Sequence, residues 1–343
     1  MSPPREATKP QDVKESLHQL IEQHGGSANA DLIREIMMTA LRMAEDGTGR
    51  GDLKLLNSAF KELRHAFHVF APYRRKRKVS IFGSARTAPD SPDYRQAREF
   101  ASRMAQEGFM VITGAGPGIM EAANAGAGKE MSFGVNILLP FEQGANRYLH
   151  GDHKLVHLKY FFTRKLLFVK ETDAVALFPG GFGTQDEGFE LLTLIQTGKS
   201  DPLPIVFLDA PGGGYWRDWL EYVQTHLVDT GKVSEEDLAL LRVTDDVEEA
   251  VQEICRFYHR YHSIRFVRDR LVIRLSRPLP EGRLEALNEA FSDILVKGRI
   301  EATSALPEES NETDIAHLDR LALYFNRAQY GRLRLLIDRI NEA

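Results

Sequence analysis

Apolar residues in the first part of the chain recur every three or four positions, as they do on one face of a helix. The first series, between positions 30 and 44, consists of Leu32, Ile33, Ile36, Met37, Ala40, Leu41 and Ala44. A second series follows the glycines near position 50 and consists of Leu53, Leu55, Leu56, Phe60, Leu63, Phe67 and Phe70. These patterns predict an N-terminal helical region over residues 1–75, and nothing in them suggests chemistry.

Between residues 76 and 262, short apolar runs without polar alternation take turns with helical stretches. The runs are Val79–Gly83, Met110–Thr113, Gly134–Leu139, Ala174–Phe178 and Ile205–Leu208. The helical stretches are Tyr94–Gln106, Gly118–Lys129, Tyr160–Glu171 and Gln185–Gly198. Such runs are typical of strands covered on both faces of a parallel sheet. We therefore predict an α/β domain with a Rossmann-like, doubly wound sheet, which would bind ligands at the carboxyl ends of its strands.

The pattern changes again over residues 268–343. Leu271, Ile273 and Leu275 alternate with other residues, and so do Leu321, Leu323 and Phe325. Helical stretches cover 281–295 and 328–341, and a further strand is expected near 299–305. This order predicts a small C-terminal β-α-β-β-α module with one half-buried sheet face. Dimerisation, regulation and bracing are all compatible with it.

Composition narrows the classes of protein. The 343 residues include 44 basic and 49 acidic side chains, a formal net charge of −5, which argues against nucleic acid as a main partner. Cys255 is the single cysteine, which excludes an intrachain disulfide and a cysteine metal cage. The first residues lack the apolar core of a signal peptide, and no apolar run approaches the roughly 20 residues that span a bilayer. We expect a soluble cytoplasmic protein without a membrane partner.

One basic run, Arg74-Arg75-Lys76-Arg77-Lys78, stands between the helical region and the first predicted strand. It has two interpretations, a patch that binds an anion or nucleic acid and a solvated linker. The acidic total favours the linker.

The first glycine cluster, Thr113-Gly114-Ala115-Gly116-Pro117-Gly118, follows a predicted strand and opens a helix. Glycines permit a tight turn and close approach of an anion, and the N-terminus of the next helix favours phosphate. A tight turn without a ligand is the alternative. Gly114 and Gly116 fit a dinucleotide fingerprint, but Ile119 occupies its third glycine position and no acidic residue ends the next strand, so NAD is disfavoured.

The second cluster, Pro179-Gly180-Gly181-Phe182-Gly183-Thr184-Gln185-Asp186-Glu187, is the stronger one. It places three glycines, a hydroxyl and two carboxylates at the end of a buried strand. Thr184 and Glu187 also have the spacing of a capping box, in which Glu187 would only fix the helix start. Capping does not explain the preceding Pro-Gly-Gly, whose backbone freedom is costly unless something must approach closely.

Arg164 and Lys165 lie early in a predicted helix. Cations at this end oppose the helix dipole, which suggests that they pair with an anion outside the helix. A salt bridge to a surface acid is the alternative.

Together these elements resemble the LOG family, the cytokinin riboside 5′-monophosphate phosphoribohydrolases formerly described as lysine decarboxylases. The family signature P-G-G-x-G-T-x-x-E is matched in full, and Arg164-Lys165 matches the upstream pair. The short first glycine loop resembles that of the larger bacterial branch. The likeness covers about residues 78–210.

The resemblance implies hydrolysis of the N-glycosidic bond of a nucleoside 5′-monophosphate, such as AMP or a cytokinin-type nucleotide, without cofactor or metal. It implies that Arg164 and Glu187 are the catalytic pair and that the chain forms a homo-oligomer. The substrate-binding residues would be Gly114, Gly116, Gly118, Lys165, Gly180, Gly181, Gly183 and Thr184. A carboxylate suits this reaction because positive charge develops on the ribose in the transition state.

Other interpretations remain at this stage. A non-catalytic nucleotide sensor or carrier on the same fold is the main one, although such a protein has little need of Glu187 beside the ribose. Asp186 is a second candidate for part of the Glu187 role. Lysine decarboxylation is rejected, because it needs a pyridoxal cofactor held by a catalytic lysine, and Lys165, the only lysine in the motifs, sits beside a better explained arginine. His150, His153 and His157 would suit a metal only if their loop were helical.

Overall fold

The computed structural model describes residues 10–25, 28–137 and 144–342. These residues form two compact units, Met1–Lys61 and Glu62–Ala343. The predicted residues Leu138 and Leu139, at the end of the third apolar run, lie outside the described residues. Within the described part of the chain, no helix is both long and apolar enough to cross a membrane.

The first unit is helical, as its apolar spacing predicts. It contains α1 (Pro10–Gln23), α2 (Ala30–Glu45) and the first part of α3 (Arg50–Phe70), which continues into the second unit. Helix α2 is amphipathic, yet none of its residues is buried, and Leu32 and Ile36 remain about half exposed.

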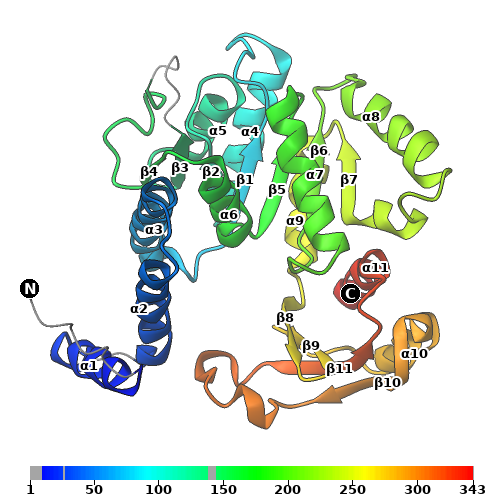
Figure 1. The fold of residues 1–343 in the computed structure, drawn as a ribbon. Helices are drawn as coiled ribbons and strands as arrows, with labels where there is room; N and C mark the ends of the chain where they lie inside the picture. The colour runs from blue at the N-terminus through cyan, green and yellow to red at the C-terminus, as the bar shows by residue number, and fades with distance from the viewer. Residues whose placement is uncertain (1–9, 26–27, 138–143, 343) are drawn as a thin grey trace, which may run out of the picture. The chain divides into compact units, whose positions relative to one another are not determined.

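The second unit is built on a seven-stranded parallel sheet of order β4-β3-β2-β1-β5-β6-β7 (Figure 1). Its strands are β1 (Lys78–Phe82), β2 (Met110–Thr113), β3 (Ser132–Ile137), β4 (Leu155–Leu158), β5 (Ala174–Leu177), β6 (Ile205–Leu208) and β7 (Leu241–Thr244). Residue pairs such as Val79–Val111 and Val79–Ala174 set the register of β1 against its two neighbours. The predicted Rossmann-like α/β class is confirmed.

Strands β4 and β7 do not appear in the sequence prediction. They form the two edges of the sheet, where each has only one neighbouring strand. Only some residues of each strand are buried, and exposed His157 and Arg242 interrupt the apolar runs. A search for continuous apolar runs finds strands covered on both faces and misses edge strands of this kind.

Helices cover both faces of this sheet. They are α4 (Pro92–Gln106), α5 (Ile119–Ala127), α6 (Phe161–Glu171), α7 (Phe182–Gln196), α8 (Tyr215–Val223) and α9 (Val247–Phe257), with the short segments η1 (Ala71–Tyr73), η2 (Gln224–Val228) and η3 (Glu235–Leu240). One core packs α4, α5 and α9 against Val79 and Ile81. The other packs α6, α7 and the end of α3 against Phe82 and Ile112. Successive side chains of β1 and β2 point to opposite faces of the sheet and therefore pack into two separate cores.

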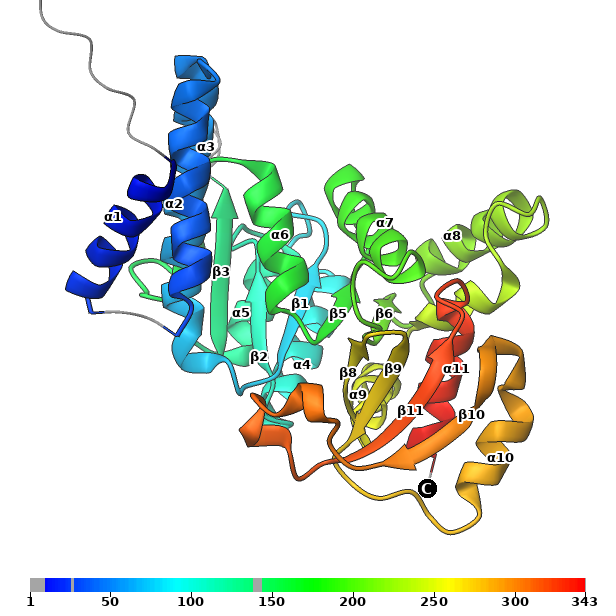
Figure 2. The same ribbon diagram turned by 60° about the horizontal axis from the view of Figure 1, so that its bottom comes forward.

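The C-terminal module is an antiparallel sheet of order β10-β11-β9-β8 (Figure 2). Its elements are β8 (Tyr261–Val267), β9 (Arg270–Leu275), α10 (Arg283–Ala290), η4 (Ser292–Ile294), β10 (Leu295–Thr303), η5 (Pro307–Glu309), η6 (Thr313–Ile315), β11 (Asp319–Phe325) and α11 (Tyr330–Asn341). Strand β8 is one more than the sequence predicts. Its buried residues recur at every third position, so its sequence lacks the alternation of apolar and polar residues by which a strand is predicted.

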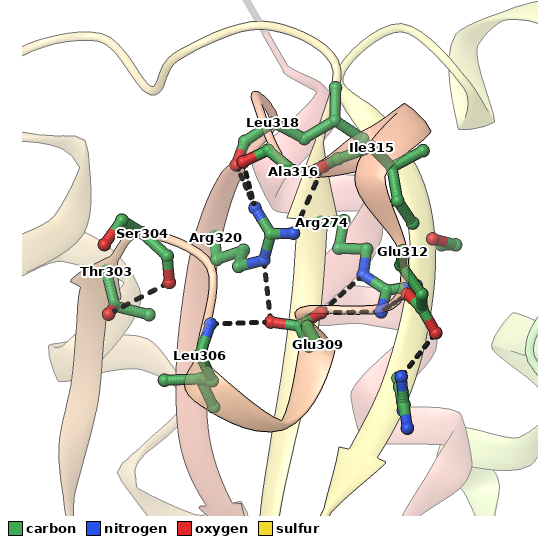
Figure 3. Close-up of polar contacts among 12 residues, drawn as sticks. Arg274, Thr303, Ser304, Leu306, Glu309, Glu312, Ile315, Ala316, Leu318 and Arg320 are labelled. Atoms are coloured by element: carbon green, nitrogen blue, oxygen red, sulfur yellow. Dashed lines mark hydrogen bonds and ion pairs between the residues drawn. The ribbon is translucent and has the colours of Figure 1, made fainter.

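The half-buried sheet face predicted for this module is wrong for β9. Leu271 and Ile273 are buried on one side, but Val272 and Arg274 are buried on the other. The segment that contains η5 and η6 carries the partners of Arg274 (Figure 3). A buried arginine is tolerated there because it is paired.

Glu309 is the centre of a buried ion network in that segment (Figure 3). Its carboxylate accepts hydrogen bonds from Arg274 Nε and Arg320 Nε, both at 2.9 Å, and from the Leu306 N–H at 3.0 Å. Burial alone would raise the pKa of Glu309, but these hydrogen bonds hold it below its usual value. Arg320 also donates to the Ile315 carbonyl at 3.1 Å, so the network fixes the whole segment on the sheet.

Candidate active site

A cavity of about 740 Å³ lies at the carboxyl ends of β1 and β5. These strands are neighbours although they are far apart in the chain: the chain proceeds from β1 to β2 on one side and returns through β5 on the other. Such a switch point leaves a crevice in which doubly wound folds bind ligands. The lining residues are Phe82, Gly83, Ser84, Ala85, Arg86, Met120, Phe161, Arg164, Gly180, Gly181, Phe182, Gly183, Thr184, Gln185, Asp186, Glu187 and Tyr215.

The loop after β5 leads directly into α7, whose first residue is Phe182 and whose N-cap is Gly181. The N–H groups of Phe182 and Gly183 make no hydrogen bond to any described residue. With the dipole of a 15-residue helix behind them, they form a site for an anion. A Cβ placed on Gly181 or Gly183 would meet nothing within 4 Å. The backbone here is therefore open to a ligand.

The capping-box interpretation of Thr184 and Glu187 is wrong. The predicted helix start at Gln185 lies three residues too late, so Thr184 is inside the first turn and no side chain caps α7. Thr184 is instead buried, and its hydroxyl occupies the space that a Cβ on Gly180 would need. Glu187 is left without a capping role.

Glu187 lines the cavity and is partly buried. Burial raises the pKa of its carboxyl group to about 7, although the positive charges of Lys165 and Arg164 act in the opposite direction. A carboxyl group with this pKa can give and take a proton near neutral pH, as a general acid or base requires.

Arg164 reaches the same cavity from the first turn of α6. Its guanidinium lies against Gly114, where a Cβ would collide with Nη2. It is also close enough to lower the pKa of Glu187. The predicted catalytic pair is therefore brought together at one cavity.

Lys165 is placed differently from Arg164. It does not line the cavity; its Nζ pairs with Asp186 at 2.8 Å and with Glu190 at 2.7 Å. This is the salt bridge that the sequence left as an alternative. Lys165 joins α6 to α7 and acts on the site through the charge it places near Glu187.

The first glycine loop also differs from expectation, because Gly114, Gly116 and Gly118 do not line the cavity. Gly118 has a φ of +67°, and a Cβ there would collide with the backbone of Ser84 and Ala85. Buried hydrogen bonds from Thr113 Oγ1 and Asn146 Nδ2 to Asn124 Oδ1, at 2.8 and 2.9 Å, hold the loop from within. This loop makes room for lining residues, and its role in substrate binding stays a prediction.

Known proteins match the domain that carries this cavity. A family model described as "Possible lysine decarboxylase" matches residues 118–254. The cytokinin riboside 5′-monophosphate phosphoribohydrolase of Mycobacterium tuberculosis is 30% identical over 163 residues, which are 46% of this chain and 82% of that protein. The chain belongs to the LOG family.

Two further matches each cover about half of this LOG-family chain. The phosphoribohydrolase of the same name from Mycobacterium marinum is 28% identical over 178 residues, 51% of this chain and 91% of that protein. A solved molybdenum cofactor binding protein from Rippkaea orientalis is 18% identical with a TM-score of 0.36, covering 52% of this chain and 96% of its own.

The LOG-family site contains residues that the motif search missed. The loop Gly83–Arg86 follows β1 and touches the second glycine cluster through a 3.1 Å hydrogen bond from the Ser84 N–H to the Pro179 carbonyl. Tyr215, at the start of α8, donates to the Gly180 carbonyl at 2.5 Å and accepts from Gln185 Nε2 at 2.8 Å. A Gly-Ser turn directly after the first strand was the available sign of the first loop. Tyr215 had none.

His150, His153 and His157 do not meet the condition set for a metal. His157 is on strand β4, and the residues around His150 form turns, so the helical spacing is absent. Within the described ranges, no three histidine, cysteine or acidic side chains are grouped as metal ligands would be.

Proposed function

We propose that this chain hydrolyses the N-glycosidic bond of a nucleoside 5′-monophosphate and releases the free base and ribose 5-phosphate. The observation that carries the proposal is the position of Glu187, whose pKa is raised to about 7, one helical turn beyond the open N-terminus of α7. The names of the two mycobacterial relatives support the same reaction class.

The geometry of α7 gives each end of the substrate a partner. The 5′-phosphate binds the free N–H groups of Phe182 and Gly183. Glu187 follows Gly183 by four residues, a rise of about 6 Å along the helix axis. Helical side chains are tilted toward the N-terminus, so its carboxylate is directed back toward the ribose.

Charge then accounts for the chemistry. The bond from C1′ to the base nitrogen breaks, its electron pair leaves with the base, and positive charge develops on the ribose. The Glu187 carboxylate stabilises that charge and accepts the proton of the water that bonds to C1′. That proton then returns to the departing base. Arg164 binds the phosphate or keeps Glu187 ionised.

Two aromatic side chains at the cavity suit the base. Phe161 and Phe182 both line it, and their relative exposures are 53% and 96%. Exposed aromatic rings beside a phosphate site can stack on any nucleobase. This arrangement recognises a base without selecting one, so AMP and a cytokinin-type nucleotide are both accommodated.

The test is chromatography of the products after incubation with a panel of nucleoside monophosphates at pH 8. Glu187→Gln should bind nucleotide normally, and its rate of base release should fall by a factor of roughly a hundred or more. The control is Glu190→Gln, a carboxylate on the same helix that does not line the cavity. Binding without base release by the unaltered protein would identify a sensor or carrier instead.

A second measurement tests the phosphate site. AMP should turn over roughly a hundredfold faster than adenosine, because phosphate contacts hold the ribose in register with Glu187. Equal rates on the two substrates would contradict a phosphate site at α7. Assembly into a homo-oligomer stays a prediction, which light scattering of the purified chain checks.

A further inference from the structure

A second cavity, of about 700 Å³, lies at the amino ends of strands β1 and β5, opposite to the carboxyl ends that form the active site. We call it the amino-edge cavity, because Arg77 directly precedes β1 and Asp173 directly precedes β5. Its other wall belongs to the C-terminal module. The lining residues are Arg74, Arg75, Lys76, Arg77, Asp173, His262, Ser263, Asp314, Ile315, His317 and Leu318. The basic run that the sequence favours as a plain linker is therefore one wall of a cavity.

The fixed charges around this cavity are predominantly positive. Four cations, residues 74–77, face two carboxylates, Asp173 and Asp314, which leaves 4 − 2 = +2 with the histidines neutral. Arg75 pairs with Asp314 at 2.5 Å. Within the described chain, the side chains of Arg74 and Lys76 make no ion pair or hydrogen bond. Four adjacent cations repel one another, and a bound anion would relieve that repulsion.

The histidines in the cavity experience this positive potential. His262 Nδ1 is 2.9 Å from the Ser263 hydroxyl, and His317 approaches from the segment before β11. Burial lowers the pKa of His262, and so do the charges of Arg77, Arg274 and His317. An anion bound beside them would reverse the electrostatic part of this effect.

The wall that carries His317 is held in place before any ligand arrives. Arg320, which is buried, donates to the carbonyls of Ile315, Ala316 and Leu318 and is itself paired with Glu309 (Figure 3). On the facing wall, the Arg77 guanidinium stacks over the Tyr258 ring at 3.5 Å. Both walls are thus preorganised, which lowers the entropy cost of binding.

We propose that the amino-edge cavity binds a phosphorylated small molecule that carries at least two negative charges. Arginine guanidinium groups match phosphate oxygens with paired hydrogen bonds, and the cavity volume accommodates a molecule of nucleotide size. The residual charge of +2 favours a ligand with at least two negative charges. Nothing in the proposed nucleotide hydrolysis uses these residues.

Three elements run from this cavity to the active site. Strand β1 connects Arg77 to the loop at Ser84, and strand β5 connects Asp173 to the loop at Gly180. Helix α6 begins with the lining residues Phe161 and Arg164 and ends at Glu171, two residues before Asp173. An anion that shifts the amino ends of β1 and β5 and the carboxyl end of α6 changes the active site at their other ends, so the cavity is regulatory. This regulatory part rests on the proposed function.

The binding test is calorimetry of the full chain with inorganic tripolyphosphate. The double variant Arg74→Glu/Lys76→Glu reverses two exposed charges, and we expect it to bind at least about tenfold more weakly. The matched control, Arg98→Glu/Lys297→Glu, makes the same change at exposed residues that line neither cavity, and its affinity should stay within about twofold. Equal affinity in the two double variants would overturn the proposal.

Two readouts separate this cavity from the active site. Tripolyphosphate should move the imidazole NMR signals of His262 and His317, and His317→Gln assigns the second signal. The same shifts should appear in Gly183→Ala, in which a methyl group occupies the proposed phosphate position at α7; if they disappear there, the ion binds at α7 and the proposal is wrong. Turnover of AMP should respond to tripolyphosphate in the unaltered protein and not in Arg74→Glu/Lys76→Glu. Binding without that response would remove the regulatory part only, and binding is measurable even if the chain hydrolyses nothing.

Discussion

The two glycine loops look alike in sequence and have different tasks in the structure. In the loop 114–118, every glycine makes room for another part of the protein: Gly114 for Arg164, Gly116 for Met120, and Gly118 for the backbone of residues 84 and 85. In the loop 180–183, the last two glycines face open space at the start of α7. A β-carbon added to the first loop meets protein, whereas one added at position 181 or 183 meets open space.

This difference shows how a glycine motif should be interpreted. Glycine loses more backbone entropy on folding than other residues do, so its presence in the folded chain needs a structural or functional reason. Packing supplies the reason in the first loop. At Gly181 and Gly183 the packing of the described residues supplies none, and neither residue has a positive φ. Under the proposed function, the phosphate that approaches these two glycines supplies the reason.

The largest expected effect tests the packing side of the comparison. Gly118→Ala puts a β-carbon at positive φ against backbone that cannot move aside, which should lower the free energy of unfolding by about 3 kcal/mol. Chemical denaturation measures this directly. A loss below about 0.5 kcal/mol would mean that the loop relaxes easily and that the contrast between the loops is false.

The next effect tests the ligand side. Gly183→Ala lies inside α7, so the variant should be as stable as the parent or slightly more stable, by up to about 1 kcal/mol. Its KM for a nucleoside monophosphate should nevertheless rise about tenfold, because the methyl group occupies the phosphate position. Calorimetry of unfolding and steady-state kinetics on the same sample check both halves. Unchanged kinetics would show that no ligand approaches this residue.

A smaller effect concerns the acid beside the open loop. The folded-state pKa of Glu187 is raised to about 7, so the folded protein binds this proton more tightly than the unfolded chain does. Stability should therefore fall as pH rises from about 4.5 to about 7 and then level off. Glu187→Gln lacks this pH-dependent loss. The free energy of unfolding of the variant, relative to that of the parent, should therefore rise by on the order of 1 kcal/mol between pH 4.5 and pH 8, a figure reduced for solvent screening. A pH-independent difference between the proteins would place the carboxylate in water.

The smallest effect concerns the neighbours of Glu187. If its carboxylate is the base, kcat/KM rises with pH through about 7. Glu190 raises the pKa of Glu187, so Glu190→Gln should move this limb to lower pH by a few tenths of a unit. Lys165 has the opposite sign, and Lys165→Met should move it to higher pH. Shifts in the same direction for both variants would rule out charge as the cause.

Sequence patterns were most reliable where a strand is buried on both faces. The runs at β1, β2, β5 and β6 are mainly apolar, and each was found within one residue of its observed bounds. The edge strands β4 and β7 and the first strand of the module, β8, were missed because one neighbour or one face is replaced by solvent or by paired charges. Buried Arg274 is the clearest case, since its polarity conceals its burial until Glu309 is seen beside it.

The candidate site divides in the same way. Arg164 and Glu187 were chosen from the family signature, and the structure places both at one cavity, although their catalytic roles await the substitutions above. The partner loop that lines the cavity is not the one that the sequence chose. The sequence favoured the glycines after β2, whereas the sheet order makes β1 the neighbour of β5 and so brings in residues 83–86.

By itself, the sequence determined the local features of this protein: the alternation of buried strands and helices, the flexible backbone at 180–183, and the presence of an acid one turn later. These depend on neighbours along the chain, which spacing and residue type report directly. The tertiary structure alone decided which loops share a cavity. It also decided that Lys165 pairs with Asp186, and that the basic run at 74–77 shares a cavity with the distant residues His262 and His317. Those outcomes depend on strand order and on the pairing of charges across elements, which no one-dimensional period contains.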